Sequence, residues 1–279
     1  MEIEIIEMAE RKAKFILKNS SPAMANALRR TMLSDIPKMA IDKVEFHLGP
    51  IMSDDKEYES VTPLFDEIVA HRLGMVPVPT DLELFTPQDM CVCGGEGCPN
   101  CTIMYSLNKI GPGTVLSGNL MPLGNPDLKV KDEFIPIVEL TDGQAVLIYA
   151  TAVMGTANKH VKWQVANGVG YKYLPKITVN PAKASSEGAL NCMKVCPKNV
   201  FEVTDGKLVV VRPRDCTICK SCMDSVDNDG SIIVEGDDRN FLFTFETDGS
   251  LTAEQTLGKA AEILSKKASA MSEEIAQLE

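Results

Sequence analysis

Residues 20–37 read SSPAMANALRRTMLSDIP, and this stretch sets the organisation of the first part of the chain. Ser20 and Ser21 followed by Pro22 supply a cap and a proline at the first helical position. Apolar residues then recur at helical spacing until Pro37 ends the pattern; they are Ala25, Leu28, Met32 and Ile36. We therefore predict one amphipathic helix between Pro22 and Pro37.

Strands are predicted on both sides of this helix. Residues 2–5 alternate with a period of two, and residues 15–17 begin a second apolar run, so the two form a predicted hairpin. A strand with apolar residues between positions 41 and 48 follows the helix. A second short helix is then predicted over residues 64–73, ended by Gly74 as a C-terminal cap.

The rest of the chain alternates between strand-rich and cysteine-rich segments. Residues 104–180 are rich in Val, Ile, Tyr and Thr and predict mostly strands and loops. Residues 182–225 predict a separate small module with a hairpin around Asp205-Gly206. Two further strands are predicted at residues 231–234 and 241–245, before a turn at Asp248-Gly249.

One long helix is predicted at the end of the chain. Residues 252–255, Thr-Ala-Glu-Gln, fit a capping box. An apolar stripe then recurs in steps of four and three, formed by Leu257, Ala261, Leu264, Ala268, Met271, Ile275 and Leu278. The stripe suits packing on the helix of a partner and packing on a sheet of the same chain equally well.

Composition excludes several classes of function. The net charge of −11 and the pI near 4.9 disfavour direct binding of nucleic acid, because an acidic surface repels phosphate. The longest nearly apolar stretch, residues 145–154, is far shorter than the roughly 18 residues of a membrane helix. The first residues lack the pattern of a secretory signal, so we expect a cytoplasmic protein without a membrane span.

Four cysteines of the small module match an iron–sulphur ligand set. Cys216, Cys219 and Cys222 follow Cys196-Pro197, which is the pattern of one half of a bacterial-type ferredoxin. Three closely spaced thiolates and one remote thiolate would hold a single 4Fe-4S cluster.

A second cluster is not expected. A second cluster would need three closely spaced cysteines, the last of them Cys192, and a fourth cysteine further along the chain. Ser186, Ala189 and Val226 occupy the other three positions. We interpret Cys192 as a buried small side chain, with a redox thiol or a substitute ligand as the minority alternative.

A second group of cysteines predicts a structural zinc site. Cys91, Cys93, Cys98 and Cys101 lie within eleven residues around a glycine-rich turn. Four thiolates complete a tetrahedral zinc site without an open coordination position, so the site would be structural. The alternative is a vacant or disulfide-linked group.

The sequence contains no pattern of a catalytic site. The three histidines, His47, His71 and His160, are scattered without a nucleophile pattern, and neither a glycine-rich phosphate loop nor a cluster of catalytic aspartates is present. Residues 224–230 lack the spacing of a calcium loop and predict a surface turn. We therefore predict a chain without an active site of its own.

Two segments carry a family resemblance. Residues 26–37 (NALRRTMLSDIP) and 66–77 (DEIVAHRLGMVP) are similar to two signatures of the alpha-type assembly subunits of cellular RNA polymerases. Residues 162–164 (KWQ) ahead of 171–173 (YKY), the terminal helix and the ferredoxin-like insertion extend the resemblance over essentially the whole chain. Within the family, the combination resembles the archaeal D-type subunits.

The resemblance implies an α+β fold in three parts. These are a discontinuous dimerisation domain (1–44 and 238–279), a mostly β insert domain (45–180 and 226–237) with the zinc loop at 91–101, and a small ferredoxin-like 4Fe-4S module (181–225). Both metals would order insertions that have few apolar residues of their own.

The resemblance also implies a role and a set of partners. The chain would pair with the small subunit L through its terminal stripe. The heterodimer would then be the assembly platform for the second-largest subunit and for the small zinc subunits N and P. Arg29 and Arg30 would contact the large subunit, although an arginine pair on a helix is more often only solvated.

The alternative hypothesis is a ferredoxin-like electron-transfer subunit of a redox complex. A single cluster makes a poor electron relay, and only residues 181–225 belong to that module. We therefore rank this hypothesis below the assembly role.

Overall fold

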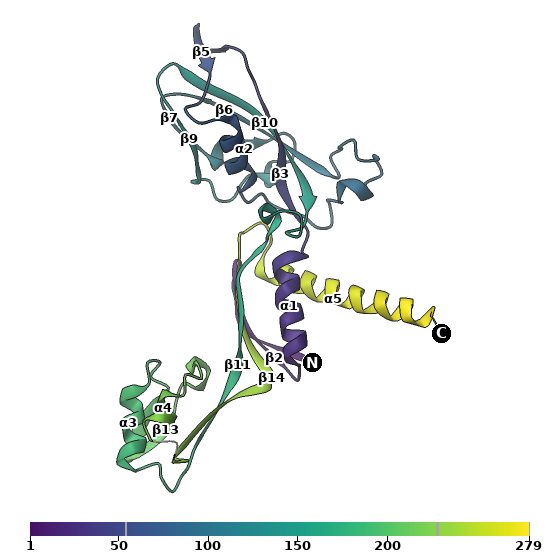
Figure 1. The fold of residues 1–279 in the computed structure, drawn as a ribbon. Coiled ribbons are helices and arrows are strands. Elements are labelled where there is room, and N and C mark those ends of the chain that lie inside the picture. The colour runs from purple at the N-terminus through teal and green to yellow at the C-terminus, as the bar shows by residue number, and fades with distance from the viewer. Residues whose placement is uncertain (54, 227–228, 279) are drawn as a thin grey trace. The chain divides into compact units, whose positions relative to one another are not determined.

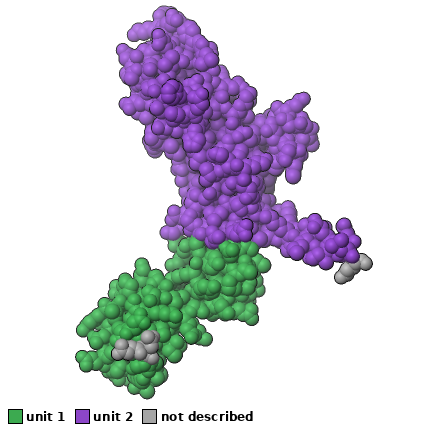
Figure 2. Space-filling model, viewed as in Figure 1, with its two compact units in different colours: residues 1–7, 13–27, 170–244 green, residues 8–12, 28–169, 245–279 purple. Residues whose placement is uncertain are grey.

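The computed structural model describes residues 1–53, 55–226 and 229–278. The chain divides into two compact units, each built from segments far apart in the sequence (Figure 2). Unit 1 comprises residues 1–7, 13–27 and 170–244, and unit 2 comprises residues 8–12, 28–169 and 245–279. The predicted α+β class is confirmed, whereas the predicted domain boundaries stay a prediction.

A four-stranded sheet joins the two ends of the chain (Figure 1). Its strand order is β1 (Glu2–Met8), β2 (Lys12–Lys18), β14 (Ile232–Thr247) and β11 (Ala166–Val179). The predicted hairpin is therefore confirmed as β1 and β2. The two strands predicted at 231–234 and 241–245 are one continuous strand, β14, since the polar residues between them stay extended instead of turning.

Aromatic side chains fill one face of this sheet within unit 1. The rings of Phe15 and Phe243 stack with centroids 5.0 Å apart, and Tyr171 lies 5.1 Å from Phe243. Phe241 contacts Tyr171 at 5.7 Å and Tyr173 at 5.4 Å. Such ring pairs add to the burial energy of the sheet.

The predicted first helix is confirmed as α1 (Pro22–Ser34). The hydroxyl of Ser21 accepts a hydrogen bond from the backbone N–H of Met24 at 3.3 Å, which caps the first turn. The predicted apolar residues Ala25, Leu28, Met32 and Ile36 are buried.

The small module is formed by α3 (Glu187–Val195), β12 (Phe201–Thr204), β13 (Lys207–Val210), the 3-10 turn η5 (Pro213–Asp215) and α4 (Ser221–Asp224). The predicted hairpin is confirmed: Asp205 and Gly206 join β12 to β13 with φ angles of 51° and 71°. The turn predicted over residues 224–230 includes residues 227–228, which lie outside the described residues.

The module has an apolar core of its own, contrary to the expectation of few apolar residues. Its buried members include Val200, Phe201 and Leu208 together with three cysteines, and Ile232 and Val234 at the start of β14 complete this core. The core is small, so cysteine-bound metal would add substantially to its order.

Unit 2 contains a six-stranded sheet whose central strand is β10 (Gln144–Gly155). β10 pairs antiparallel with β3 (Lys38–Phe46) and with β6 (Thr102–Ile110). The remaining strands of this sheet are β4 (Ile51–Ser53), β5 (Lys56–Ser60) and β8 (Leu120–Pro122), and β7 (Gly113–Leu116) pairs separately with β9 (Pro136–Leu140). The predicted strand-rich character of residues 104–180 is confirmed.

Helix α2 (Asp66–Gly74) packs on this sheet, and Val69 and Leu73 enter its core. The prediction that Gly74 caps the helix was wrong: Gly74 is the last helical residue, and Met75 follows it in a right-handed conformation. A Cβ atom on Gly74 would lie 3.4 Å from the carbonyl oxygen of Ile41. Gly74 therefore lies where α2 packs against β3, and a Cβ atom there would make an ordinary van der Waals contact.

Short 3-10 turns complete unit 2; they are η1 (Gln88–Met90), η2 (Ser117–Asn119), η3 (Pro126–Leu128) and η4 (Val161–Trp163). The predicted terminal helix is α5 (Ala253–Ala276), and its capping box is confirmed by reciprocal hydrogen bonds between Thr252 and Gln255. In the described part of the chain, every helix is too short or too polar to cross a bilayer.

Candidate metal centres and partner surface

The loop between η1 and β6 brings four thiols together. The sulphur atoms of Cys91, Cys93, Cys98 and Cys101 all lie within 4.8 Å of one another. Three Sγ–Sγ distances are 3.5 Å for Cys91–Cys98, 3.6 Å for Cys93–Cys101 and 3.8 Å for Cys98–Cys101. Among the described residues, this is the one group of three or more His, Cys, Asp or Glu side chains that could hold a single metal ion.

Glycines shape the backbone of this loop. Gly94, Gly95 and Gly97 have φ angles of 68°, 91° and 93°, which residues with a side chain rarely adopt. The backbone N–H of Gly94 donates to the carbonyl of Cys91 at 3.0 Å, and the side-chain amide of Gln88 donates to the carbonyl of Gly95 at 2.8 Å. The predicted glycine-rich turn is thus confirmed.

The thiols of this loop differ in acidity. The backbone N–H groups of Gly97 and Gly95 lower the pKa of Cys93 to about 6, because they stabilise the thiolate. Burial raises the pKa of Cys101 to about 12. The site therefore contains one thiol that ionises readily and one that needs a metal to ionise at neutral pH.

The geometry of the four sulphurs fits a tetrahedral ion. With metal–sulphur bonds of about 2.3 Å, a tetrahedral zinc places its sulphurs roughly 3.8 Å apart. The three Sγ–Sγ distances given above lie close to this value. The four thiols are therefore close enough together to hold one metal ion.

The second group of cysteines lines a pocket in the small module. Cys196, Cys216, Cys219 and Cys222 surround it together with Pro197, Lys198, Phe201, Thr217, Lys220 and Val234. Cys216 and Cys222 are buried, Cys196 is half-buried and Cys219 is exposed. The structure thus brings Cys196 and the three predicted ligands between residues 216 and 222 to one pocket.

Backbone N–H groups point at two of these sulphurs. The N–H of Val200 donates to Sγ of Cys196 at 3.5 Å, and the N–H of Ile218 donates to Sγ of Cys216 at 3.4 Å. Hydrogen bonds to cysteine sulphur are a general feature of iron–sulphur sites. These donors and the cysteine-lined pocket fit a bound cluster.

The loop between the cysteines has an unusual backbone. Ile218 and Lys220 have φ angles of 57° and 63°. A positive φ is a real outlier for a β-branched residue and is retained only where the surroundings enforce it. The N–H of Ile218, at one of these two positions, is the donor to Sγ of Cys216.

Cys192 lies apart from the pocket, in agreement with its interpretation as a buried side chain. It is fully buried, and its thiol lies 3.2 Å from the carbonyl oxygen of Cys222 and 3.3 Å from the hydroxyl of Ser225. Burial raises its pKa. Such a thiol is protonated at neutral pH.

The terminal helix leaves most of its apolar stripe uncovered. Its first two turns are buried in the chain through Ala253, Thr256, Leu257 and Ala260. Beyond them, Leu264 is half-buried, whereas Ala261, Ala268, Met271 and Ile275 are exposed. The hypothesis that the whole stripe packs on a sheet of the same chain was therefore wrong.

The other predicted contact residues lie on α1. Arg30 is exposed and Arg29 is half-buried. Asp35, just past the end of α1, forms an ion pair with Lys267 of α5 at 2.5 Å. The three histidines are all exposed.

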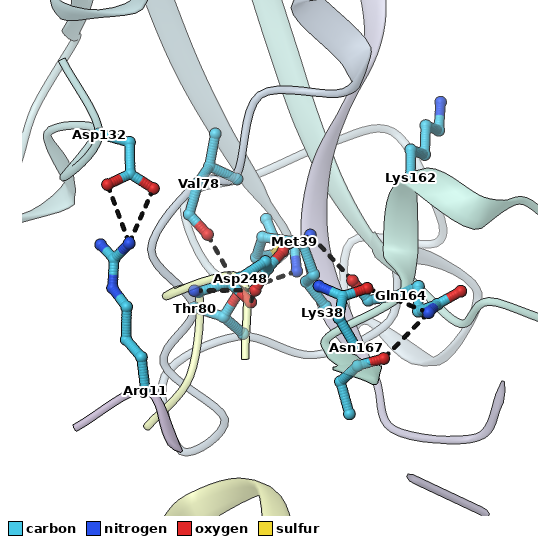
Figure 3. A network of polar contacts seen from close by, with 12 residues as sticks. Arg11, Lys38, Met39, Val78, Thr80, Asp132, Lys162, Gln164, Asn167 and Asp248 are labelled. Atoms are coloured by element: carbon cyan, nitrogen blue, oxygen red, sulfur yellow. Dashed lines mark hydrogen bonds and ion pairs between the residues drawn. The ribbon is translucent and has the colours of Figure 1, made fainter. Parts of the chain in front are cut away.

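Sequence reasoning missed a polar network in unit 2. Lys38 forms a buried ion pair with Asp248 and also donates to the carbonyl oxygen of Gln164 at 3.4 Å (Figure 3). Nearby, Arg11 pairs with both carboxylate oxygens of Asp132 at 2.9 Å. Both pairs join segments more than 100 residues apart, and local sequence patterns give no signal for such contacts.

The first and last segments of the chain thus meet in one sheet, and the second half of α5 is exposed. The chain belongs to the RNA polymerase Rpb3/Rpb11 dimerisation domain family, which it matches over residues 14–268.

Three proteins are similar to this chain over nearly its whole length, and each carries the name DNA-directed RNA polymerase subunit Rpo3. The protein of Thermoplasma volcanium is 46% identical over 261 residues, which cover 93% of this chain and 94% of the relative. The proteins of Picrophilus torridus and Archaeoglobus fulgidus are 42% and 39% identical, over 99% and 100% of this chain and 100% and 99% of their own length. The resemblance inferred from the two signature segments is confirmed at the level of the family.

Proposed function

We propose that this chain is a non-catalytic assembly-platform subunit of an archaeal DNA-directed RNA polymerase. It pairs with the small subunit L and then recruits the second-largest subunit and the small zinc subunits N and P. One observation carries the proposal: a chain of a dimerisation family leaves Ala261, Ala268, Met271 and Ile275 of the α5 stripe exposed. An apolar helix face of this length calls for a partner.

The dimerisation domain is assigned to residues 1–44 and 238–279. Residues 45–180 and 226–237 form the insert domain, and residues 181–225 form the metal module. Arg30 is exposed on α1 and supports a docking role for the Arg29–Arg30 pair, since arginine suits polar interfaces. With its net charge of −11, the chain contacts its protein partners and not the nucleic acid directly.

The loop at 91–101 holds one structural zinc. The sulphur spacing, the four thiol ligands and the absence of other ligand types in the group support zinc over harder ions. All four coordination positions are filled by the protein. The zinc therefore fixes the loop and takes no part in catalysis.

The pocket of the small module holds one 4Fe-4S cluster through Cys196, Cys216, Cys219 and Cys222. The sulphur-directed N–H groups and the strained backbone at Ile218 support this assignment. When bound, the cluster supplies four thiolate–iron bonds that tie residue 196 to the 216–222 loop. The electron-transfer alternative is not favoured, because the relatives that cover the whole chain are polymerase subunits.

Affinity purification from cells tests this function. A tagged chain should bring down the small partner and both large polymerase subunits. A tagged Met271→Asp variant should lose all of them, because pairing precedes recruitment. Recovery of redox enzymes in place of polymerase subunits would overturn the proposal.

A further inference from the structure

A single lysine holds the backbone beside Cys216. Lys172 lies on β11, and its ammonium donates to the carbonyl oxygen of Arg214 at 2.7 Å and to that of Cys216 at 2.8 Å. The side chain is half-buried. Because an ammonium that loses water needs acceptors in its place, these two hydrogen bonds fix the loop to the strand.

A second contact lies between the same loop, at Ile218, and strand β14. A Cβ atom on Gly236 would lie 2.8 Å from Cβ of Tyr173 and 3.4 Å from Cδ1 of Ile218. The side chains of Tyr173 and Ile218 therefore both lie against Gly236 on β14, where a larger residue would displace Tyr173. Lys172 thus holds residues 214 and 216 of the loop, and Gly236 provides space for residue 218.

A third contact is weaker. Arg214 pairs with Glu4 of β1 at 3.0 Å, and Glu4 also pairs with Lys18 of β2 at 2.5 Å. These side chains are substantially exposed, so the pairs contribute little on their own. Lys172 therefore makes the main polar contacts between β11 and the loop that contains Arg214 and Cys216.

We propose that Lys172 is a positioning residue for the metal pocket. It holds the carbonyls of Arg214 and Cys216 so that the sulphur of Cys216 stays in the pocket with the other three cysteines. Its positive charge also lies beside a site where four thiolates gather. This inference rests on the iron–sulphur assignment of the proposed function, because a fixed Cys216 matters most when the pocket is filled.

The test variant is Lys172→Met in the full-length chain. This substitution removes both hydrogen bonds and the positive charge and keeps a side chain of similar length. The matched control is Lys176→Met, an exposed lysine on the same strand. Lys172→Arg keeps the charge and donors and serves as the conservative variant. Lys172→Gln, shorter and neutral, is the second test if Lys172→Met does not fold.

The first measurement uses metal-free protein. Amide hydrogen exchange across residues 213–222 should be faster in Lys172→Met than in the unaltered chain, most of all at the N–H of Ile218. Lys176→Met should match the unaltered chain. Lys172→Arg should lie close to it.

The second measurement uses protein reconstituted with iron and sulphide without oxygen. Iron release to a chelator should be about tenfold faster in Lys172→Met, which is the usual effect of losing a group that orients a metal ligand. The reduction potential of the cluster should fall, because a positive charge favours the reduced form. A general loss of packing would not be reversed by Lys172→Arg, whereas lost positioning would be.

The two measurements separate the possible failures. If Lys172→Met equals Lys176→Met in both exchange and iron release, Lys172 does not position the loop. If the unaltered chain binds no iron, the proposed cluster is wrong. The exchange experiment then still decides whether Lys172 orders the loop.

Discussion

Lys38 and Asp248 form a buried ion pair that joins the strand after α1 to the turn before α5. The Lys38 side chain is 3% exposed and that of Asp248 is 12% exposed. Asp248 also accepts hydrogen bonds from the backbone and the hydroxyl of Ser250. The pair thus connects the early and the late parts of unit 2, 210 residues apart (Figure 3).

Removing one partner of this pair should destabilise the protein strongly. Lys38→Met leaves the Asp248 carboxylate buried without its counter-charge, at an expected cost of roughly 3 to 5 kcal/mol. Denaturant unfolding of the heterodimer measures the change. The double variant Lys38→Met with Asp248→Asn should be more stable than Lys38→Met alone; a less stable double variant would contradict the assignment of the pair.

The two metal sites should be independent of each other. Replacing Cys91, Cys93, Cys98 and Cys101 by Ser should remove about one zinc per chain and leave about four irons, since the two sites share no ligand. Elemental analysis of protein purified without oxygen measures both metals. Zinc that remains in this variant, or close to eight irons in the unaltered chain, would disprove the metal assignments.

Zinc binding should depend on pH with a defined sign. At pH 7 the Cys93 thiol, with a pKa of about 6, is already ionised, whereas the Cys101 thiol, with a pKa of about 12, must give up its proton. Binding should therefore release fewer than four protons, and affinity should fall as the pH decreases. Titration calorimetry in buffers of different ionisation enthalpy measures the proton count. Release of four protons would show that Cys93 is not ionised beforehand.

The small module should matter for recruitment and not for pairing. Replacing Cys196, Cys216, Cys219 and Cys222 by Ser should leave the heterodimer intact and weaken recovery of the second-largest subunit. Quantitative pull-down under anaerobic conditions measures this step. Cys192→Ser is the control and should retain iron. Equal recovery by both variants would limit the cluster to a local structural role, and loss of pairing would link the module to the dimerisation domain.

Local signals in the sequence were sufficient for several elements. The Pro22 start of α1, the capping box of Thr252 and the hairpin at Asp205-Gly206 were predicted because each depends on residues within a few positions. The 91–101 loop was predicted for the same reason, since its ligands and glycines are adjacent. The resemblance to the polymerase subunits supplied the family.

Long-range contacts could not be predicted in this way. Gly74 looked like a helix cap, but it is the last helical residue of α2 and lies beside Ile41 of β3, which only the fold reveals. The polar residues inside β14 hid the continuity of that strand. Lys172 gave no signal of its contact with the Cys216 loop, because the two positions are brought together by the path of β11.

Pairing through α5 is the central claim of the proposed function. Leu264→Asp or Met271→Asp places a carboxylate in the apolar stripe and should weaken pairing by roughly 2 to 5 kcal/mol. Ser269→Asp adds the same charge on the other side of the helix and is the matched control. The control should pair like the unaltered chain.

The most direct test is the native mass of the chain co-expressed with its small partner, measured at decreasing concentration. The unaltered chain and Ser269→Asp should give a one-to-one heterodimer, and Met271→Asp should give separate chains. A Met271→Asp variant that remains a heterodimer at the lowest concentration would contradict pairing through α5.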